Sequence, residues 1–515
     1  MGAMTIRPNL SDNGSTPRRF RIGILGAGFG GLGMAIRLRQ AGIRDFVVWE
    51  RDEEVGGTWW ANSYPGCQCD IPSHLYSFSF APNPNWTRTY PLQPELRSYL
   101  RECSDRYGVR HHVRLSCEVT AAAWDDDAGV WQVETSQGPF TVELLIAGPG
   151  FLSEPATPAL PGLENFEGET FHTARWNHDH DVTGRRVAVI GTGASAIQVV
   201  PRIQPIVAHL DVFQRTPPWV MPHRDRPITN FERRIYRRFP ALQRLVRRTV
   251  YLTRELLVPG FVHRPRLLKL PQRVAARHLE KHVADPALRA RLTPDYSFGC
   301  KRVLPSNDWY PAITQPNVNV VTDGIREVVP TGIVSGDGVL HEVDTIVFAT
   351  GFYVTDVRFA KLVRGRNGAL MSDVWNGSPQ AYRGTAVAGF PNLFILTGPN
   401  TGLGHNSLVY MIEAQLDYLM DALAKMEQRG ATRIEVRRVA QDAYNQKLQS
   451  RMGRTVWNSG GCSSWYIDAN GKNTTIWPDF TWRFRWQMRE FDLAAYEMSA
   501  PATAIERSSS DRLAQ

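Results

Sequence analysis

The chain contains two glycine-rich segments whose spacing suits the binding of a dinucleotide. The first lies between a short apolar stretch at 22–25 and a helical stretch that begins near Leu32, and a second apolar stretch, 46–49, ends at Glu50. In this order of elements, N–H groups at the helix start bind a pyrophosphate, and the terminal acid accepts hydrogen bonds from ribose hydroxyls. The loop glycines that fit this role are Gly26, Gly28 and Gly31.

The second segment repeats this plan with the opposite charge at its end. It follows an apolar stretch at 187–190, and Arg215 occupies the place that Glu50 has in the first unit. A carboxylate repels a ribose 2′-phosphate, whereas a guanidinium pairs with it through two hydrogen bonds. We therefore expect FAD in the first unit and NADPH in the second, which is an arrangement suited to hydride transfer. The loop residues expected at the second pyrophosphate are Gly191, Gly193, Ala194 and Ser195.

Length and composition are those of a soluble protein with several domains. The 515 residues exceed what one core can hold, and 43% hydrophobic with 21% charged residues is ordinary for globular chains. We find no apolar run of membrane-spanning length, and residues 1–19 lack the apolar stretch of a secretory signal. The six cysteines lack the spacing of a disulfide framework or a zinc site, which favours a reduced, cytoplasmic setting without a metal.

The net charge of +9 is concentrated in one segment. Residues 224–291 contain eighteen lysines and arginines against five acids, interleaved with apolar residues at helical spacing. A solvated helical cap is the favoured interpretation, and peripheral contact with anionic lipid is the next. No recognised nucleic-acid-binding fold accompanies the segment, so we expect no nucleic-acid partner.

The stretch between the two units matches a family signature. Residues 166–176 follow the pattern F-x-G-x-x-x-H-T-x-x-W, and in this the sequence resembles the Baeyer–Villiger monooxygenases, although Asn177 stands where the family usually has Pro or Asp. Further similar segments lie at 56–60, 464–466 and 469–472, the last two resembling a mobile loop that folds over the nicotinamide. The signature residues are Phe166, Gly168, His172, Thr173 and Trp176.

The resemblance implies a reaction and a set of site residues. The family converts a ketone to an ester or lactone with O2, through a flavin peroxide formed on FAD that NADPH has reduced. By this resemblance Arg302 lies over the flavin and stabilises the negative charge of the reaction, and Asp70 orients that arginine. Lys301 is expected to join Arg215 and Thr216 around the 2′-phosphate. The other residues expected at the cofactors are Thr58, Trp59, Tyr64 and Trp465.

The expected fold class is α/β, with two Rossmann-like dinucleotide-binding domains and a helical insertion. The signature falls at a linker between domains, so we favour a structural or conformational role for His172 over that of a base. The expected segments are a disordered leader at 1–19, FAD-binding pieces at 20–150 and 390–500, NADPH-binding pieces at 151–223 and 301–389, the basic helical insertion at 224–300, and a disordered tail at 501–515.

Three other functions remain open on the sequence. The nearest is a flavin monooxygenase that oxygenates nitrogen or sulfur, although such enzymes usually carry Tyr or Phe at the place of Trp176. A flavin-dependent reductase or disulfide-exchange enzyme would require a redox cysteine pair, and Cys67 and Cys69 lack the usual C-x-x-C spacing. The third is a catalytically silent protein that binds a lipid or a partner. The ketone and the oligomeric state are not indicated by the sequence.

Overall fold

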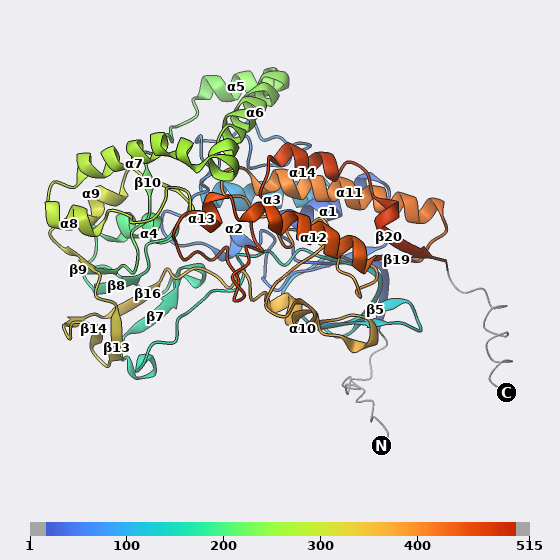
Figure 1. Ribbon diagram of the computed structural model, residues 1–515, viewed down its shortest axis with the longest axis horizontal. Helices are drawn as coiled ribbons and strands as arrows, with labels where there is room; N and C mark the ends of the chain where they lie inside the picture. The colour runs from blue at the N-terminus through green and yellow to red at the C-terminus, as the bar shows by residue number, and fades with distance from the viewer. Residues whose placement is uncertain (1–16, 501–515) are drawn as a thin grey trace.

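The computed structural model describes residues 17–500, which form two large and three small sheets with helices around them and a helical segment above (Figure 1). The leader and tail expected at 1–19 and 501–515 lie almost entirely outside the described residues. The first strand begins at Arg18, inside the expected leader. No helix within the described residues is both long enough and apolar enough to span a bilayer.

The first sheet has eight strands in the order β17-β4-β5-β6-β1-β2-β3, with β18 paired to β6. β1 (Arg18–Leu25) runs parallel to β2 (Phe46–Trp49) and to β6 (Phe140–Ala147), and α1 (Phe29–Gln40) connects β1 to β2. This is the strand-loop-helix-strand unit that the first glycine segment predicts. The other strands are β3 (Val113–Arg114), β4 (Val119–Asp125), β5 (Val130–Thr135), β17 (Val363–Arg364) and β18 (Leu393–Ile395).

The second sheet has five parallel strands in the order β12-β9-β8-β16-β7. β8 (Arg186–Ile190) leads into α4 (Ala196–Ile203), and β9 (His209–Phe213) follows, as the second glycine segment predicts. Both units therefore carry their loops at the carboxyl ends of parallel strands, where open α/β sheets bind ligands. The other strands are β7 (Glu169–His172), β12 (Val318–Val321) and β16 (Thr345–Phe348).

The chain returns to the first sheet earlier than the expected boundary at residue 390. β17 pairs with β4, and Phe359, Trp375 and Val387 lie in the hydrophobic core of the first sheet. Within 359–387, β17 therefore lies in the first sheet, and the three core residues pack against it. The difference arises because β17 pairs with a strand more than 200 residues away in sequence, and such pairing leaves no local pattern.

A long helix joins the two sequence pieces that build the first domain. α11 (Leu408–Gln428) packs along α1, where Gly33 permits close approach, since a Cβ there would lie 2.8 Å from a methyl of Leu416. The smaller elements are α2 (Thr58–Ala61), α3 (Gln93–Arg106), α9 (Trp309–Ile313), α10 (Met371–Trp375), α12 (Arg438–Met452), α13 (Val456–Ser459), α14 (Thr481–Gln487), β10 (Val220–Met221), β11 (Leu304–Pro305), β13 (Ile325–Val329), β14 (Gly332–Ser335), β15 (Leu340–Glu342), β19 (Arg433–Val436) and β20 (Tyr496–Ser499).

The basic segment is helical, as expected. It contains α5 (Asn230–Arg238), α6 (Pro240–Glu255), α7 (Lys269–His282) and α8 (Pro286–Arg291). α5 and α6 rise from the upper side of the molecule, and α7 continues over the second sheet (Figure 1).

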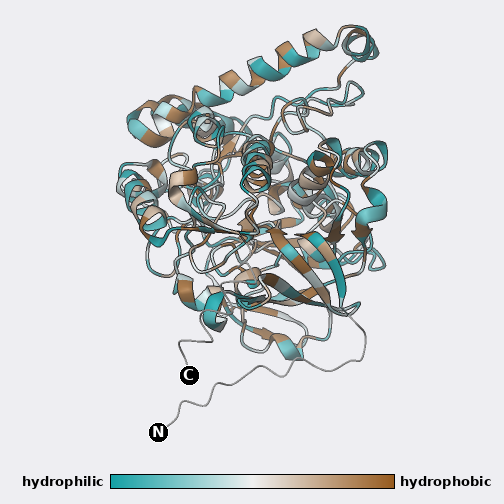
Figure 2. Cartoon of the chain, turned by 90° about the vertical axis from the view of Figure 1, so that its right-hand side faces the viewer, coloured by the Kyte–Doolittle hydropathy of each residue, from teal (hydrophilic) through white to brown (hydrophobic). Residues whose placement is uncertain are grey.

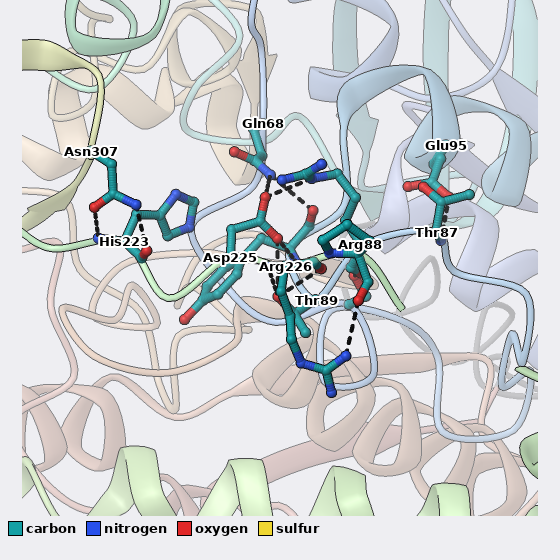
Figure 3. A network of polar contacts seen from close by, with 12 residues as sticks. Gln68, Thr87, Arg88, Thr89, Glu95, His223, Asp225, Arg226 and Asn307 are labelled. Atoms are coloured by element: carbon teal, nitrogen blue, oxygen red, sulfur yellow. Dashed lines mark hydrogen bonds and ion pairs between the residues drawn. The ribbon is translucent and has the colours of Figure 1, made fainter. Parts of the chain in front are cut away.

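A buried carboxylate fastens the start of this segment to the first domain (Figure 3). Asp225 accepts hydrogen bonds from Gln68 Nε2 at 2.9 Å and from Thr89 Oγ1 at 3.0 Å, and its Oδ2 lies 2.7 Å from Arg88 Nε. Burial acts to raise the pKa of Asp225, but the hydrogen bonds from Gln68 and Arg88 outweigh it and lower the pKa. The folded state therefore holds this carboxyl ionised more firmly than the unfolded chain does.

We expect Asp225→Ala to lower the free energy of unfolding by about 1–2 kcal/mol at pH 7, because it leaves the half-buried donors Gln68, Arg88 and Thr89 without their acceptor. The contribution of Asp225 is fully present above its ordinary pKa of 3.8 and is lost as the pH falls below that value. Urea unfolding of wild type and variant should therefore converge towards low pH. Asp356→Ala, which removes an exposed ion pair with Lys361, should change stability little; a pH-independent loss in Asp225→Ala would contradict the argument.

Candidate active site at the junction of two dinucleotide loops

A cavity of about 1080 Å³ lies where the two glycine loops approach each other. Its lining comes from both dinucleotide units, from the segment that carries Lys301 and Arg302, and from the loop that carries Trp465. The structure thus brings together residues that are far apart in sequence. Of the expected cofactor and catalytic residues, those that line it are Gly26, Gly28, Glu50, Thr58, Trp59, Tyr64, Asp70, Gly191, Gly193, Ala194, Ser195, Arg215, Thr216, Lys301, Arg302 and Trp465.

The shape of the first loop depends on glycines, because a side chain at these positions would force the neighbouring backbone to move. Gly26 has a φ of 89°, in the left-handed region, and a Cβ there would lie 2.5 Å from the carbonyl oxygen of Gly148. A Cβ on Gly31 would lie 1.8 Å from the carbonyl oxygen of Gly26. Gly31 does not line the cavity itself but allows α1 to begin directly under the loop.

Glu50 is buried at the end of β2 and contacts the first loop. Its Oε2 accepts a hydrogen bond from Ala27 N at 2.6 Å, and its Oε1 accepts one from Asp52 N at 3.1 Å. Burial raises the pKa of Glu50, and the backbone hydrogen bond from Ala27 works in the opposite direction. The acid therefore fixes the loop and also borders the space that an adenosine ribose would fill.

Cations gather at the corresponding end of the second unit. Arg215 is exposed at the cavity edge and forms no ion pair with any described residue, and Thr216 accepts a hydrogen bond from Thr192 Oγ1 at 3.0 Å. Lys301 Nζ lies 5.0 Å from the ring centre of Tyr296. Burial and the nearby charge of Arg215 lower the pKa of Lys301. Two cations that repel each other create a strong site for an anion.

Arg302 is held by a two-pronged ion pair in the same cavity. Its Nε and Nη2 donate to the two carboxylate oxygens of Asp70 at 2.5 and 2.6 Å, and its Nη1 donates to the carbonyl oxygen of Leu403 at 3.0 Å. Burial acts to raise the pKa of Asp70, but the charge of Arg302 outweighs it and lowers that pKa; Asp70 in turn raises the pKa of Arg302. Both groups are therefore charged.

Of the remaining expected residues, Tyr64 connects the two domains, whereas Trp59 and Thr58 pack within the first. Tyr64 donates its hydroxyl to Gln198 Oε1 at 2.9 Å, and Gln198 belongs to α4 of the second unit. Trp59 is buried and donates its indole N–H to the hydroxyl of Tyr76 at 3.3 Å. Thr58 begins the short helix α2, whose preceding glycine packs against the first loop.

A disulfide links two segments of the cavity wall and corrects the expectation that the cysteines are reduced. Cys300 is bonded to Cys462, with Cα atoms 6.1 Å apart. The bond lies next to Lys301 and close to Trp465, whose ring lies 6.5 Å from that of Phe151. The two cysteines are 162 residues apart, so their spacing in sequence gave no sign of the pair. The remaining four cysteines, Cys67, Cys69, Cys103 and Cys117, are free and buried.

The signature residues do not line the cavity; they lie on and beside β7, an edge strand of the second sheet. His172 Nδ1 accepts a hydrogen bond from Ala174 N at 3.0 Å, and burial lowers the pKa of His172 to about 4. The ring of Trp176 packs 4.9 Å from that of Phe171. The others are Phe166, packed against the core of the second sheet, the buried Thr173, and Gly168, where a Cβ would meet the carbonyl of Asp344.

Several cavity residues were missed by the sequence analysis. The Leu403 carbonyl contacts Arg302, and Gln198 connects the two units, yet neither belongs to a recognisable motif. Arg51 directly follows Glu50, pairs with Glu154 and donates to the carbonyl of Ser153 at 2.8 Å. Only Arg51 could have been noticed, from its place after the acid that ends β2.

The fold and the cavity define a two-dinucleotide oxidoreductase, and comparisons with known proteins agree. Residues 23–244 match a family model described as pyridine nucleotide-disulphide oxidoreductase. A Baeyer–Villiger monooxygenase of Pseudomonas aeruginosa is 51% identical over 95% of this chain and 93% of its own length. Cyclohexanone monooxygenase from Rhodococcus sp. Phi1 bound to NADP+ has a TM-score of 0.83 at 30% identity, over 94% of this chain and all of its own. OTEMO in complex with FAD and NADP has a TM-score of 0.84 at 26% identity, with the same coverage.

The chain belongs to the Baeyer–Villiger monooxygenase family. The resemblance, the fold class and the enzyme class expected from the sequence are therefore confirmed.

Proposed function

We propose that the chain binds FAD at the first loop and NADPH at the second, and uses O2 to convert a ketone to an ester or lactone. The observation that carries the proposal is the Arg302–Asp70 pair, which lies in a cavity that both loops border. Membership of the family gives the class of reaction. The contacts in this chain support the roles that we assign to the loop residues, Arg302 and Asp70.

The residues of both loops fit the two cofactors. The space over Gly26 and Gly28 is kept free of side chains, which suits a pyrophosphate, and Glu50 suits the ribose hydroxyls. Arg215 and Lys301 suit a 2′-phosphate, which distinguishes NADPH from NADH. When bound, the nicotinamide supplies hydride, and the flavin accepts it and activates oxygen.

Arg302 supplies a fixed positive charge where negative charge develops on oxygen. Three of its five guanidinium N–H groups are used by Asp70 and Leu403, so two remain as donors. Because the ion pair holds the guanidinium plane in one orientation, little reorganisation is needed when the substrate oxygen becomes anionic. Asp70 stays ionised and positions the arginine, and neither residue has to exchange a proton.

NADPH-dependent oxygen uptake against a panel of ketones, with products identified by mass, tests the proposal directly. Formation of an ester or lactone supports it. A simple thioether should be tested in parallel, because sulfoxide formation without any ester would assign the chain to the sulfur-oxygenating class instead. NADPH oxidation without an oxygenated product from either substrate would also contradict the proposal.

We expect the double variant Arg215→Ala, Lys301→Ala to lose its preference for NADPH over NADH by about a hundredfold, because two charge-assisted contacts to the 2′-phosphate are removed. The ratio of kcat/KM for the two nucleotides measures this. Lys447→Ala, which removes an exposed lysine on α12, should leave the ratio unchanged. A double variant with wild-type preference would place the 2′-phosphate elsewhere.

A further inference from the structure

Helix α6 carries an apolar stripe on the side that faces solvent. Leu242, Leu245 and Leu252 follow one another along one face of the helix, with Thr249 between the last two, and Leu256 continues this face at the residue after the helix. All four leucines are exposed, Leu245 to 57% and Leu256 to 77%. Figure 2 shows α6 across the top of the molecule, with hydrophobic and hydrophilic residues alternating along it and no other element above.

The opposite side of α6 fixes this orientation. Gln243 donates to the carbonyl of Asn83 at 2.7 Å, and Arg247 donates to the carbonyl of Ser77 at 2.8 Å. Glu255 accepts from Thr481 Oγ1 at 2.7 Å. Each of these contacts joins α6 to another part of the protein. Rotation of the helix to bury the leucine stripe would therefore break them. The stripe is therefore a permanent feature of the surface.

The charges beside the stripe are of one sign. Neither acid of α5 and α6 is exposed: Glu232 pairs with Arg226 at 2.7 Å, and the buried Glu255 accepts hydrogen bonds from Thr481 and Asn406. No exposed carboxylate therefore accompanies the exposed arginines of these two helices. Those arginines are Arg234, Arg237, Arg238, Arg244 and Arg248.

Two exposed tryptophans lie on α14, the helix that adjoins the carboxyl end of α6. Trp482 and Trp486 lie one turn apart on α14 and are exposed to 48% and 71%. α14 adjoins the carboxyl end of α6, since Thr481 contacts both Tyr251 and Glu255 of that helix. Tryptophan is the side chain most typical of the boundary between water and lipid.

We propose that this face docks on an anionic lipid bilayer, with α6 lying in the plane of the surface. The leucine stripe would enter the acyl boundary, and the arginines beside it would reach the headgroup phosphates with their charged ends. Self-association through α6 fits less well, because two copies would bring arginines together with no exposed acid on either helix to pair with them. An anionic lipid surface avoids this repulsion, because its negative charges pair with the arginines.

The proposal does not depend on the ketone reaction, because vesicle binding is measured separately from enzyme activity. Purified full-length protein is sedimented at low salt with vesicles of phosphatidylcholine alone or of equal parts phosphatidylcholine and phosphatidylglycerol. We expect binding only to the mixed vesicles. The triple variant Leu245→Asn, Leu252→Asn, Leu256→Asn should lower the bound-to-free ratio at least about tenfold, because it removes most of the inserted apolar surface.

A matched control places the same change elsewhere. Val339, Leu340 and Val439 are exposed apolar residues outside the helical segment, and their replacement by Asn should leave vesicle binding unchanged. NADPH oxidation in solution should be the same in all three proteins, which shows that each is folded. Wild-type protein that stays in the supernatant would overturn the proposal, and so would undiminished binding of the α6 variant. A wild-type dimer in sedimentation velocity that the α6 variant loses would instead assign the stripe to self-association.

Discussion

The Arg302→Ala variant is expected to retain FAD and to oxidise NADPH, yet to form ester at least about a hundredfold more slowly than wild type. Removal of one fixed donor to a developing oxyanion costs about 3 kcal/mol in barrier height. The substitution should spare cofactor binding, because the glycine loops, Glu50 and Arg215 make no direct contact with the Arg302 side chain. Ester is measured by mass and NADPH by absorbance, so that the two rates separate uncoupled turnover from loss of the enzyme.

Two further variants define what Arg302 contributes. Arg302→Lys keeps the charge but cannot make the two-pronged contact with Asp70, so it should recover only part of the rate. Arg186→Ala removes an arginine that pairs with Asp344 at the start of β8, at the other end of the strand from the glycine loop, and it should leave the ester rate unchanged. Wild-type ester formation by Arg302→Ala would exclude Arg302 from the reaction, whatever its place in the cavity.

The two dinucleotide units could be predicted because each is formed by one continuous stretch of the sequence. A glycine such as Gly26 must adopt a positive φ beside a neighbouring backbone, and the terminal Glu50 or Arg215 selects the ribose by its charge alone. These requirements act over about 30 residues, which is the length over which a sequence pattern can be recognised. The resemblance to the family then added Arg302 and Asp70, for which the sequence offers no local pattern.

The remainder of the site depends on contacts between distant segments. Leu403 contributes a backbone carbonyl, so its side-chain type carries no signal of the contact with Arg302. The Cys300–Cys462 bond and the pairing of β17 with β4 join residues that the chain brings together only when the whole fold forms. The apolar residues of α6 were visible in the sequence as helical spacing, but only the structure shows that its leucines face solvent while Gln243 and Glu255 are buried.

Gly31→Ala is expected to weaken the retention of FAD strongly, whereas Gly30→Ala should retain it. A Cβ on Gly31 would lie 1.8 Å from the carbonyl oxygen of Gly26, so α1 or the loop must move, whereas a Cβ on Gly30 meets Leu396 at 3.5 Å and the Gly148 Cα at 4.0 Å, which are ordinary contacts. Such overpacking against backbone costs about 3 kcal/mol, which corresponds to a loss of affinity of about a hundredfold. Flavin absorbance per protein after desalting measures retention, and circular dichroism checks that both variants are folded. Equal flavin content in the two variants would show that the loop can shift at little cost, and the assignment of the first unit to FAD would lose its structural basis.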